Sequence, residues 1–281
     1  MRNPNQIVVS QDSEAQYLES YDIRAYAQQS IAADIAVFSM LDETVDNHRK
    51  DSETKLHLLL IKRGEHPFRD QWALPGGFLR NDETVEECAL REIREETNLT
   101  PVALIPIGVF SKPDRDPRGR IVSNAFASVQ CEPTKVIGGS DAGEAKWFEV
   151  DFHREANGVF RLRLKADGEL LETQLELKES RLMGRRFTIR SNSCLAFDHG
   201  EIIATAMMAM RDGAEDYKLA LDFLPEKFTL SALQRVQEIL SGESLLSANF
   251  RRKIVEHVEE TDEFTEGVGH RPARLYKRRG V

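Results

Sequence analysis

The chain has 281 residues, of which 41% are hydrophobic and 30% are charged, and its formal net charge is −9. This composition is ordinary for a globular protein, and the length favours two domains. No run of about eighteen apolar residues occurs and no signal-peptide stretch is seen, so neither a membrane span nor secretion is expected. The three widely spaced cysteines argue against a disulfide framework and fit a reducing cytoplasm.

The first elements expected along the chain are two buried strands, 30–41 and 55–64. Both segments (SIAADIAVFSML and KLHLLLIKRG) are apolar and have polar, charged neighbours. The polar residues 1–28 are assigned to an N-terminal extension, and 42–54 to a charged loop. The same reasoning predicts further strands at 102–110, 120–129 and 145–151.

A helix is expected from about Val85 to Glu96. Thr84, followed three residues later by Glu87, matches the capping-box pattern at its start. On a helical wheel the apolar positions form one arc, made of Val85, Cys88, Ala89 and Ile93.

Three glutamates of this helix do not lie opposite the apolar arc. Glu92 is seven residues after Val85 and Glu96 is seven after Ala89, so both project from the apolar side, with Glu95 beside them. Carboxylates so placed repel one another and resist burial unless a cation neutralises them. A hard divalent ion, Mg²⁺ or Mn²⁺, would do so, but a salt-bridged surface remains an equal alternative on the residues alone.

The segment from Gly77 to Leu99 resembles the Nudix box, G-x5-E-x7-R-E-U-x-E-E-x-G-U, where U is apolar. Every fixed position matches except the last glycine, which is Asn98 here. Asparagine is the residue that best replaces glycine at a helix end with positive φ. The resemblance implies the Nudix fold, an α/β/α sandwich with a mixed sheet.

The resemblance also implies a role for each box residue. The family cleaves diphosphates with water, and divalent ions stabilise charge and activate the nucleophile. The general base would be a box glutamate or one outside it, and the sequence leaves this open. The implied metal ligands are Glu92, Glu95 and Glu96, with Gly77 at the metal site, Arg91 orienting a glutamate, Glu83 supporting the metal region, and Gly76 with Gly77 shaping the loop.

Residues 112–120 (KPDRDPRGR) form a basic loop soon after the box. The loop is either a solvated charged turn or a set of cations that holds phosphate. The segments ALPGGF, DPRGR, AKWF and LAFDHGEII resemble the Nudix-related regulators of NAD metabolism and their ADP-ribose-handling relatives. That resemblance implies ADP-ribose or a related nucleoside diphosphate derivative as ligand. The expected ligand-binding residues are Gly76, Gly77, Arg115, Arg118 and Arg120.

Two aromatic residues and one histidine are more typical of structure than of ligand binding. Phe126 and Trp147 are expected in the core, with ring stacking as the alternative. His199 is likewise expected to be structural.

Residues 159–178 carry the strongest hairpin pattern in the chain. Two alternating segments flank a turn at Asp167-Gly168, and 185–190 would add a third strand. The stretch 152–194 is therefore interpreted as an inserted or elaborated β segment of a Nudix domain that spans 29–215. A helix at 199–210 and a linker at 211–218 would follow.

The final segment, 222–281, has the outline of a winged helix-turn-helix. A helix with apolar residues at helical spacing ends at Ser241-Gly242, and a second helix is expected from Ser247 to Val258. Gly267 and Gly269 then mark a turn between two extended pieces.

From Glu226 onward the chain has ten Lys and Arg against nine Asp and Glu, in contrast to the acidic remainder. The segment resembles the same group of regulators, which implies binding to double-stranded operator DNA. A dimerisation module is the alternative. The expected DNA-binding residues are Asn249, Arg251, Arg252, Lys253, Arg271 and Arg274, with Lys277, Arg278 and Arg279 also on the wing.

The combined expectation is a cytoplasmic homodimer with no membrane partner. Its Nudix domain would bind and hydrolyse ADP-ribose with Mg²⁺, and its winged helix would bind DNA in a ligand-dependent way. Two alternatives remain open: a plain ADP-ribose pyrophosphatase with a structural C-terminal domain, and a ligand sensor without turnover.

Overall fold

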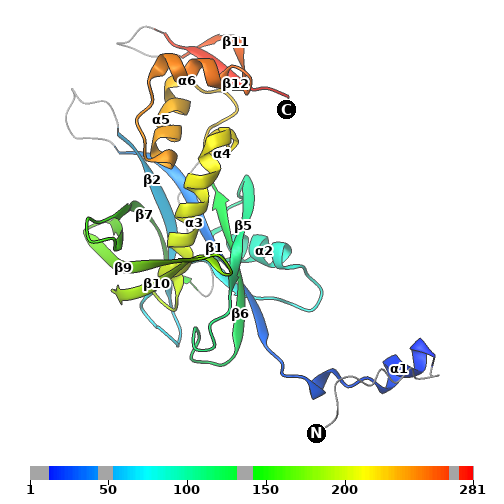
Figure 1. Cartoon of the computed structure of the whole chain (residues 1–281). Coiled ribbons are helices and arrows are strands. Elements are labelled where there is room, and N and C mark those ends of the chain that lie inside the picture. Colours follow the sequence, from blue (N-terminus) through cyan, green and yellow to red (C-terminus); the bar gives the residue numbers. More distant parts are fainter. Residues whose placement is uncertain (1–12, 44–52, 132–141, 266–271, 281) are drawn as a thin grey trace.

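A computed structural model of the chain describes residues 13–43, 53–131, 142–265 and 272–280 (Figure 1). Ten strands form one mixed sheet in the order β10-β9-β8-β7-β2-β1-β6-β5, with β3 beside β2 and β4 beside β1. β1 and β6 are parallel, and the other pairs are antiparallel. The strands are β1 (Ser30–Glu43), β2 (Glu53–Arg63), β3 (Trp72–Ala73), β4 (Gly76–Phe78), β5 (Ala103–Phe110), β6 (Ile121–Val129), β7 (Ala142–Arg154), β8 (Phe160–Ala166), β9 (Glu169–Ser180) and β10 (Gly184–Asn192).

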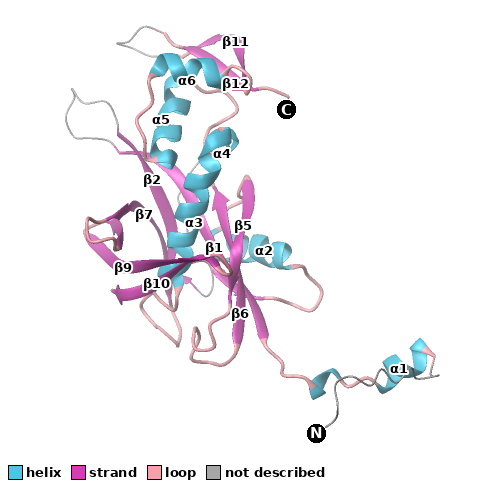
Figure 2. Cartoon of the chain, viewed as in Figure 1, coloured by secondary structure: helices cyan, strands magenta, loops and turns pink. Residues whose placement is uncertain are grey.

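Two helices, α2 (Val85–Thr97) and α3 (His199–Gly213), cover opposite faces of this sheet (Figure 2). Alternate residues of β1 show this directly, because side chains of a strand alternate between faces. Ile35 packs in one core cluster with Ile93 of α2, whereas Phe38 packs in the other with Ile203 of α3. The predicted α/β/α sandwich is confirmed.

Helix α2 begins and ends as the sequence predicts. Thr84 and Glu87 form the reciprocal capping box. Asn98 ends the helix with φ 57°, the left-handed conformation that glycine usually supplies at this position. The substitution of Asn for the last glycine of the box therefore leaves the helix end intact.

The predicted hairpin and third strand are β8, β9 and β10. They continue the main sheet beyond β7 and do not form a separate unit. Leu162, Leu164, Leu171 and Leu175 are buried between this extension and α3. The stretch 152–194 is thus an enlargement of the sandwich.

Residues 211–218 are not the predicted linker. Helix α3 continues to Gly213, and a 3₁₀ turn (Ala214–Asp216) leads into α4 (Lys218–Asp222). The linker prediction relied on the polar residues of RDGAEDYK, but Ala214 and Tyr217 are buried and hold the turn in the core.

The C-terminal segment has the order of elements of a winged helix. It contains α5 (Leu230–Ser241), α6 (Ser247–Ile254), β11 (Val258–Phe264) and β12 (Arg274–Arg278). Helix α6 is shorter than predicted, since Val258 already begins β11. The expected turn at Gly267 and Gly269 lies outside the described residues.

The winged helix and the sandwich share one hydrophobic core. Met207 and Met210 of α3 belong to the same buried cluster as Leu233 and Val236 of α5, and as Phe250 of α6. Between the two parts, the Gln237 side chain donates a hydrogen bond to the Ala214 carbonyl, and Arg278 pairs with Asp222 at 2.8 Å. Helix α3 therefore packs in the core of both parts of the molecule.

The N-terminal residues 13–29 project from the body as an arm that includes the short helix α1 (Glu14–Ser20) (Figure 1). Each of these residues is exposed. Among the described helices, none is long and apolar enough to cross a membrane.

Candidate functional site

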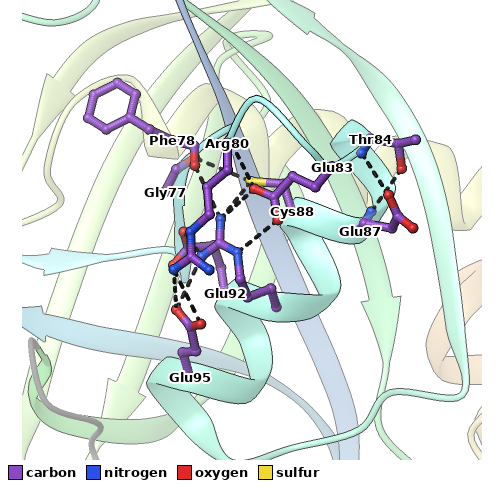
Figure 3. Close-up of polar contacts among 10 residues, drawn as sticks. Gly77, Phe78, Arg80, Glu83, Thr84, Glu87, Cys88, Glu92 and Glu95 are labelled. Carbon is purple, nitrogen blue, oxygen red and sulfur yellow. Dashed lines mark hydrogen bonds and ion pairs between the residues drawn. The ribbon is translucent and has the colours of Figure 1, made fainter.

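The side chain of Arg91 binds three acidic residues, one just before α2 and two on the helix. Its guanidinium donates to both oxygens of Glu83 at 2.7 and 2.9 Å, to Glu92 Oε1 at 2.6 Å and to Glu95 Oε2 at 3.1 Å. Figure 3 shows Glu83, Glu92 and Glu95 gathered at this point. Hydrogen bonding to Arg91 lowers the pKa of Glu83 to about 2.

Two glycines allow the glutamates to approach the backbone of β4. A Cβ atom at Gly77 would lie 2.2 Å from Glu92 Oε1, and one at Gly76 would lie 2.2 Å from the Ala33 carbonyl oxygen. The Gly76 amide donates to Glu96 Oε2 at 2.9 Å. Any side chain at these two positions would displace the carboxylates or the strand.

Burial disfavours the charged forms of Glu92 and Glu96. Burial raises the pKa of Glu96 to about 8, and the nearby charges of Glu92 and Asp34 add to this effect. Burial also raises the pKa of Glu92, although Arg91 opposes the change. Both glutamates therefore lie on the inward side of α2, as their spacing predicts.

The chemistry of these donors fits a hard divalent cation, because carboxylate oxygens are its preferred ligands. The third expected ligand, Glu95, has a half-exposed side chain that faces Arg80 at 3.4 Å and Arg91. Accordingly, no three His, Cys, Asp or Glu side chains within the described ranges are grouped so that they already surround an ion. Glu95 would have to turn from these two arginines to join Glu92 and Glu96.

A cleft beside the box is lined by aromatic and cationic side chains. The guanidinium of Arg118 lies 5.0 Å from the ring centre of Phe78 and 5.6 Å from that of Phe197. Arg63 lies 4.9 Å from the Phe197 ring. The same cleft is bordered by Asp34 and by Gly76 and Gly77, the two glycines that Glu96 and Glu92 approach.

The three arginines expected to bind ligand have different environments. Arg118 lines the cleft and pairs with Asp116 at 2.8 Å. Arg120 donates to the Ser111 carbonyl at 2.7 Å and is not among the residues lining the cleft. Arg115 also borders the cleft, but it is buried and held between Asp34 and Asp198.

His199 is bound to the backbone. Its Nδ1 accepts from the Leu74 amide at 2.9 Å, and burial lowers its pKa, so the ring is held neutral. Phe126 is 3% exposed and Trp147 packs on the same core cluster, in agreement with the structural role expected for both.

Sequence reasoning missed the cleft residues Asp34, Arg63, Phe78 and Phe197. Asp34 did carry a signal, because it is the charged residue inside the apolar segment SIAADIAVF. Phe78 and Phe197 lie in the segments ALPGGF and LAFDHGEII that carry the resemblance, but their residue type alone did not mark them as cleft residues, since aromatic residues are usual in loops and cores alike.

In the winged helix, α6 presents the predicted basic face. Asn249, Arg251, Arg252 and Lys253 are all exposed, and Arg252 donates a hydrogen bond to Asn249. Neither Arg251 nor Lys253 forms an ion pair with a residue that the structure describes. On the wing, Arg274 pairs with Glu260, whereas Arg271 lies outside the described residues. Arg251 and Lys253 of α6 thus present positive charges that no described acidic side chain neutralises.

Comparisons with known proteins agree with this architecture. Residues 44–163 match the NUDIX domain family, and residues 220–277 match the family of the NrtR DNA-binding winged helix domain. The chain is 27% identical to the ADPR responsive transcriptional repressor NtrR of Acinetobacter baylyi, over 96% of this chain and 90% of that protein. It is 47% identical to the ADP-ribose pyrophosphatase of Methanocaldococcus jannaschii over 34% of this chain and 55% of that enzyme.

Solved structures show the same arrangement over most of the chain. Shewanella oneidensis NrtR superposes with a TM-score of 0.61 at 25% identity, covering 89% of this chain and 94% of that one. The same protein in complex with a 27mer DNA gives a TM-score of 0.59 at 25% identity, covering 89% of this chain and 93% of that one.

The chain is therefore a Nudix-domain protein with a C-terminal DNA-binding winged helix. That winged helix is of the NrtR type. The N-terminal domain of the chain belongs with the Nudix hydrolases, which generally use divalent ions such as Mg²⁺ or Mn²⁺.

Proposed function

We propose that this protein is a DNA-binding transcriptional regulator whose affinity for its operator depends on whether a ligand occupies the cleft. The ligand is ADP-ribose or a related nucleoside diphosphate derivative. The observation that carries the proposal is the position of α3. Asp198 and His199, at the start of this helix, contact residues of the cleft, and Met210, near its end, belongs to the core shared with the winged helix. The similarity to a repressor named for its response to ADP-ribose supports the choice of ligand.

The cleft offers side chains for the base and for the diphosphate of such a ligand. Phe78 and Phe197 present ring faces on which a base can stack. Arg118, now between them, is placed to turn towards a diphosphate, since guanidinium groups form paired hydrogen bonds with phosphate oxygens. Arg115 contributes indirectly, because its guanidinium is occupied by Asp34 and Asp198.

Hydrolysis of the bound diphosphate is the second part of the proposal. A bound Mg²⁺ or Mn²⁺ would stabilise negative charge on the phosphates and lower the pKa of the attacking water. Glu92 and Glu96 would hold the ion with Glu95, and Arg91 would keep Glu92 oriented. The complete set of box carboxylates favours retained catalysis, and the ADP-ribose pyrophosphatase similarity indicates the substrate class.

DNA contact is assigned to the exposed face of α6. Asn249, Arg251, Arg252 and Lys253 would enter the major groove or meet phosphates, with Arg274 and Arg271 on the wing. We further propose that the protein acts as a homodimer, so that two winged helices bind paired half-sites and ligand changes their spacing.

Calorimetric titration with ADP-ribose tests the ligand assignment. We expect binding by the wild type and a loss of about tenfold in affinity for Phe78→Ala or Arg118→Ala. Arg24→Ala, on the exposed arm, is the matched control and should bind normally. Absence of binding by the wild type would exclude ADP-ribose as the ligand.

Hydrolysis is tested separately with ADP-ribose, Mg²⁺ and an added phosphatase that releases phosphate from the two monophosphate products. The wild type should release phosphate, and Glu92→Gln should reduce the rate by about a hundredfold or more. If the wild type binds ADP-ribose without hydrolysing it, the protein is a ligand sensor and the proposed hydrolase activity is excluded.

A further inference from the structure

The exposed arm, residues 13–29, carries more apolar surface than its position explains. Tyr17, Leu18 and Ile23 are 53%, 60% and 59% exposed. Tyr21 packs against Tyr17 and Tyr26, with ring centres 5.7 and 6.0 Å apart, and all three residues are exposed. Such a concentration of exposed aromatic groups marks a contact surface.

A groove on the sandwich lies between the two edge strands of the sheet. Residues of β5 form one wall, residues of β10 form the other, and α3 contributes Glu201 and Thr205; the volume is about 520 Å³. Its apolar surface comes from Ile107, Val109, Phe110, Met183 and Phe187. Val109 and Met183 remain 54% and 59% exposed, so the groove has apolar area to cover.

The rim of this groove has an unbalanced positive charge. Lys178 and Arg186 are directly opposite each other in the β9–β10 ladder, and both are exposed. Like charges at such a position repel unless an anion lies between them. Neither side chain forms an ion pair with any residue of the described ranges, and both line the groove.

The arm has the complementary charge. Its residues 13–26 include Glu14, Glu19 and Asp22 but one basic residue, Arg24. An acidic segment rich in tyrosine matches a groove with apolar walls and a basic rim. The arm of the same chain extends away from the sandwich (Figure 1).

We propose that the arm of one chain docks into the β5–β10 groove of a second copy, so that a homodimer is formed by reciprocal exchange of arms. The tyrosine and leucine side chains of residues 17–26 cover the apolar walls, and Glu19 and Asp22 neutralise Lys178 and Arg186. Because Glu201 and Asp198 on α3 also line the groove, arm docking places the dimer contact beside the helix that leads to the winged helix. This inference specifies the surface of the proposed homodimer and rests on that part of the proposed function.

Reciprocal charge reversal tests the exchange in the full-length protein. One variant carries Glu19→Lys and Asp22→Lys in the arm, and the other carries Lys178→Glu and Arg186→Glu in the groove. By sedimentation equilibrium we expect the dissociation constant of each homodimer to rise about tenfold or more. An equimolar mixture should regain wild-type affinity as a heterodimer, because each arm then meets a groove of opposite charge.

Two controls make the outcome specific. The pair Arg94→Glu and Lys165→Glu, on exposed sites elsewhere, should leave dimerisation unchanged, and thermal unfolding should confirm that every variant is folded. Dimers that persist in both charge variants, or a mixture that stays monomeric, would overturn the arm exchange while leaving ligand and DNA binding intact. A wild type that is monomeric at all concentrations would overturn the homodimer itself.

Discussion

Arg115 and Asp198 are joined by two hydrogen bonds, Nη2 to Oδ1 at 2.7 Å and Nε to Oδ2 at 3.0 Å, although 83 residues separate them in the chain. The pair ties the basic loop after β5 to the first residues of α3. Arg115 also binds Asp34, whose Oδ2 accepts from Ser123 at 2.6 Å. A ligand that moves the loop must therefore act on α3, which shares its core with the winged helix.

Asp198→Asn should weaken this connection. The substitution keeps the shape of the side chain but removes its charge, and we expect a loss of about 2 kcal/mol in the free energy of unfolding. ADP-ribose should still bind, whereas its effect on DNA affinity should be lost. Fluorescence anisotropy of labelled operator DNA with and without ADP-ribose measures this effect.

Asp216→Asn provides the control, since Asp216 is exposed and faces only Lys218 at 3.8 Å. Its response to ADP-ribose should equal that of the wild type. An undiminished response in Asp198→Asn would show that the signal does not pass through the start of α3.

Gly77→Ala should displace Glu92. The added Cβ would overlap the Glu92 carboxylate, which can swing away because it ends a flexible side chain. We expect a fall of about tenfold or more in affinity for Mn²⁺, measured by electron paramagnetic resonance, with little change in thermal stability. Gly213→Ala, where the nearest atom is 3.9 Å away, should bind Mn²⁺ normally.

Glu96 should make the stability of the metal-free protein depend on pH. Its pKa is raised from an ordinary value of 4.5 to about 8, so between these values the folded state holds a proton that the unfolded state has released. The free energy of unfolding should therefore fall as pH rises through this window, by at most about 1.4 kcal/mol per pH unit.

Urea unfolding at several pH values measures this dependence as the difference between the wild type and Glu96→Gln. The subtraction matters because His199, whose lowered pKa favours the folded state at higher pH, acts in the opposite direction. Identical pH profiles for the two proteins would contradict the buried, protonated state of Glu96.

The double substitution Arg251→Ala and Arg252→Ala should weaken DNA binding by about tenfold to a hundredfold. Two fewer phosphate contacts should also reduce the slope of log affinity against log salt by about 2. Anisotropy titrations at several salt concentrations measure both quantities. Arg94→Ala, an exposed arginine on α2, should change neither, and an unchanged slope in the double variant would remove α6 from the DNA interface.

Much of the fold was predictable because its signals are local. The strands, the capping box, the hairpin at Asp167-Gly168 and the ending of α5 at Gly242 each depend on a few adjacent residues. The box was equally visible, since its carboxylates have fixed spacing on one helix.

What the sequence did not show depends on contacts between distant segments. The position of Arg115 between Asp34 and Asp198 could not be read from its own loop, because both carboxylates come from distant segments. Similarly, the polar residues of 211–218 predicted a linker. The prediction was wrong because Ala214 and Tyr217 are buried against α5 and α6, which cannot be inferred from the segment itself.

The central claim is that ligand binding in the cleft and DNA binding by the winged helix are coupled. It is tested most directly by measuring the affinity of the full-length protein for DNA from upstream of its own gene, without ADP-ribose and at saturating ADP-ribose. Coupling through α3 predicts a change of about fivefold or more in the dissociation constant, which Asp198→Asn abolishes. Equal dissociation constants in the two conditions would contradict the account.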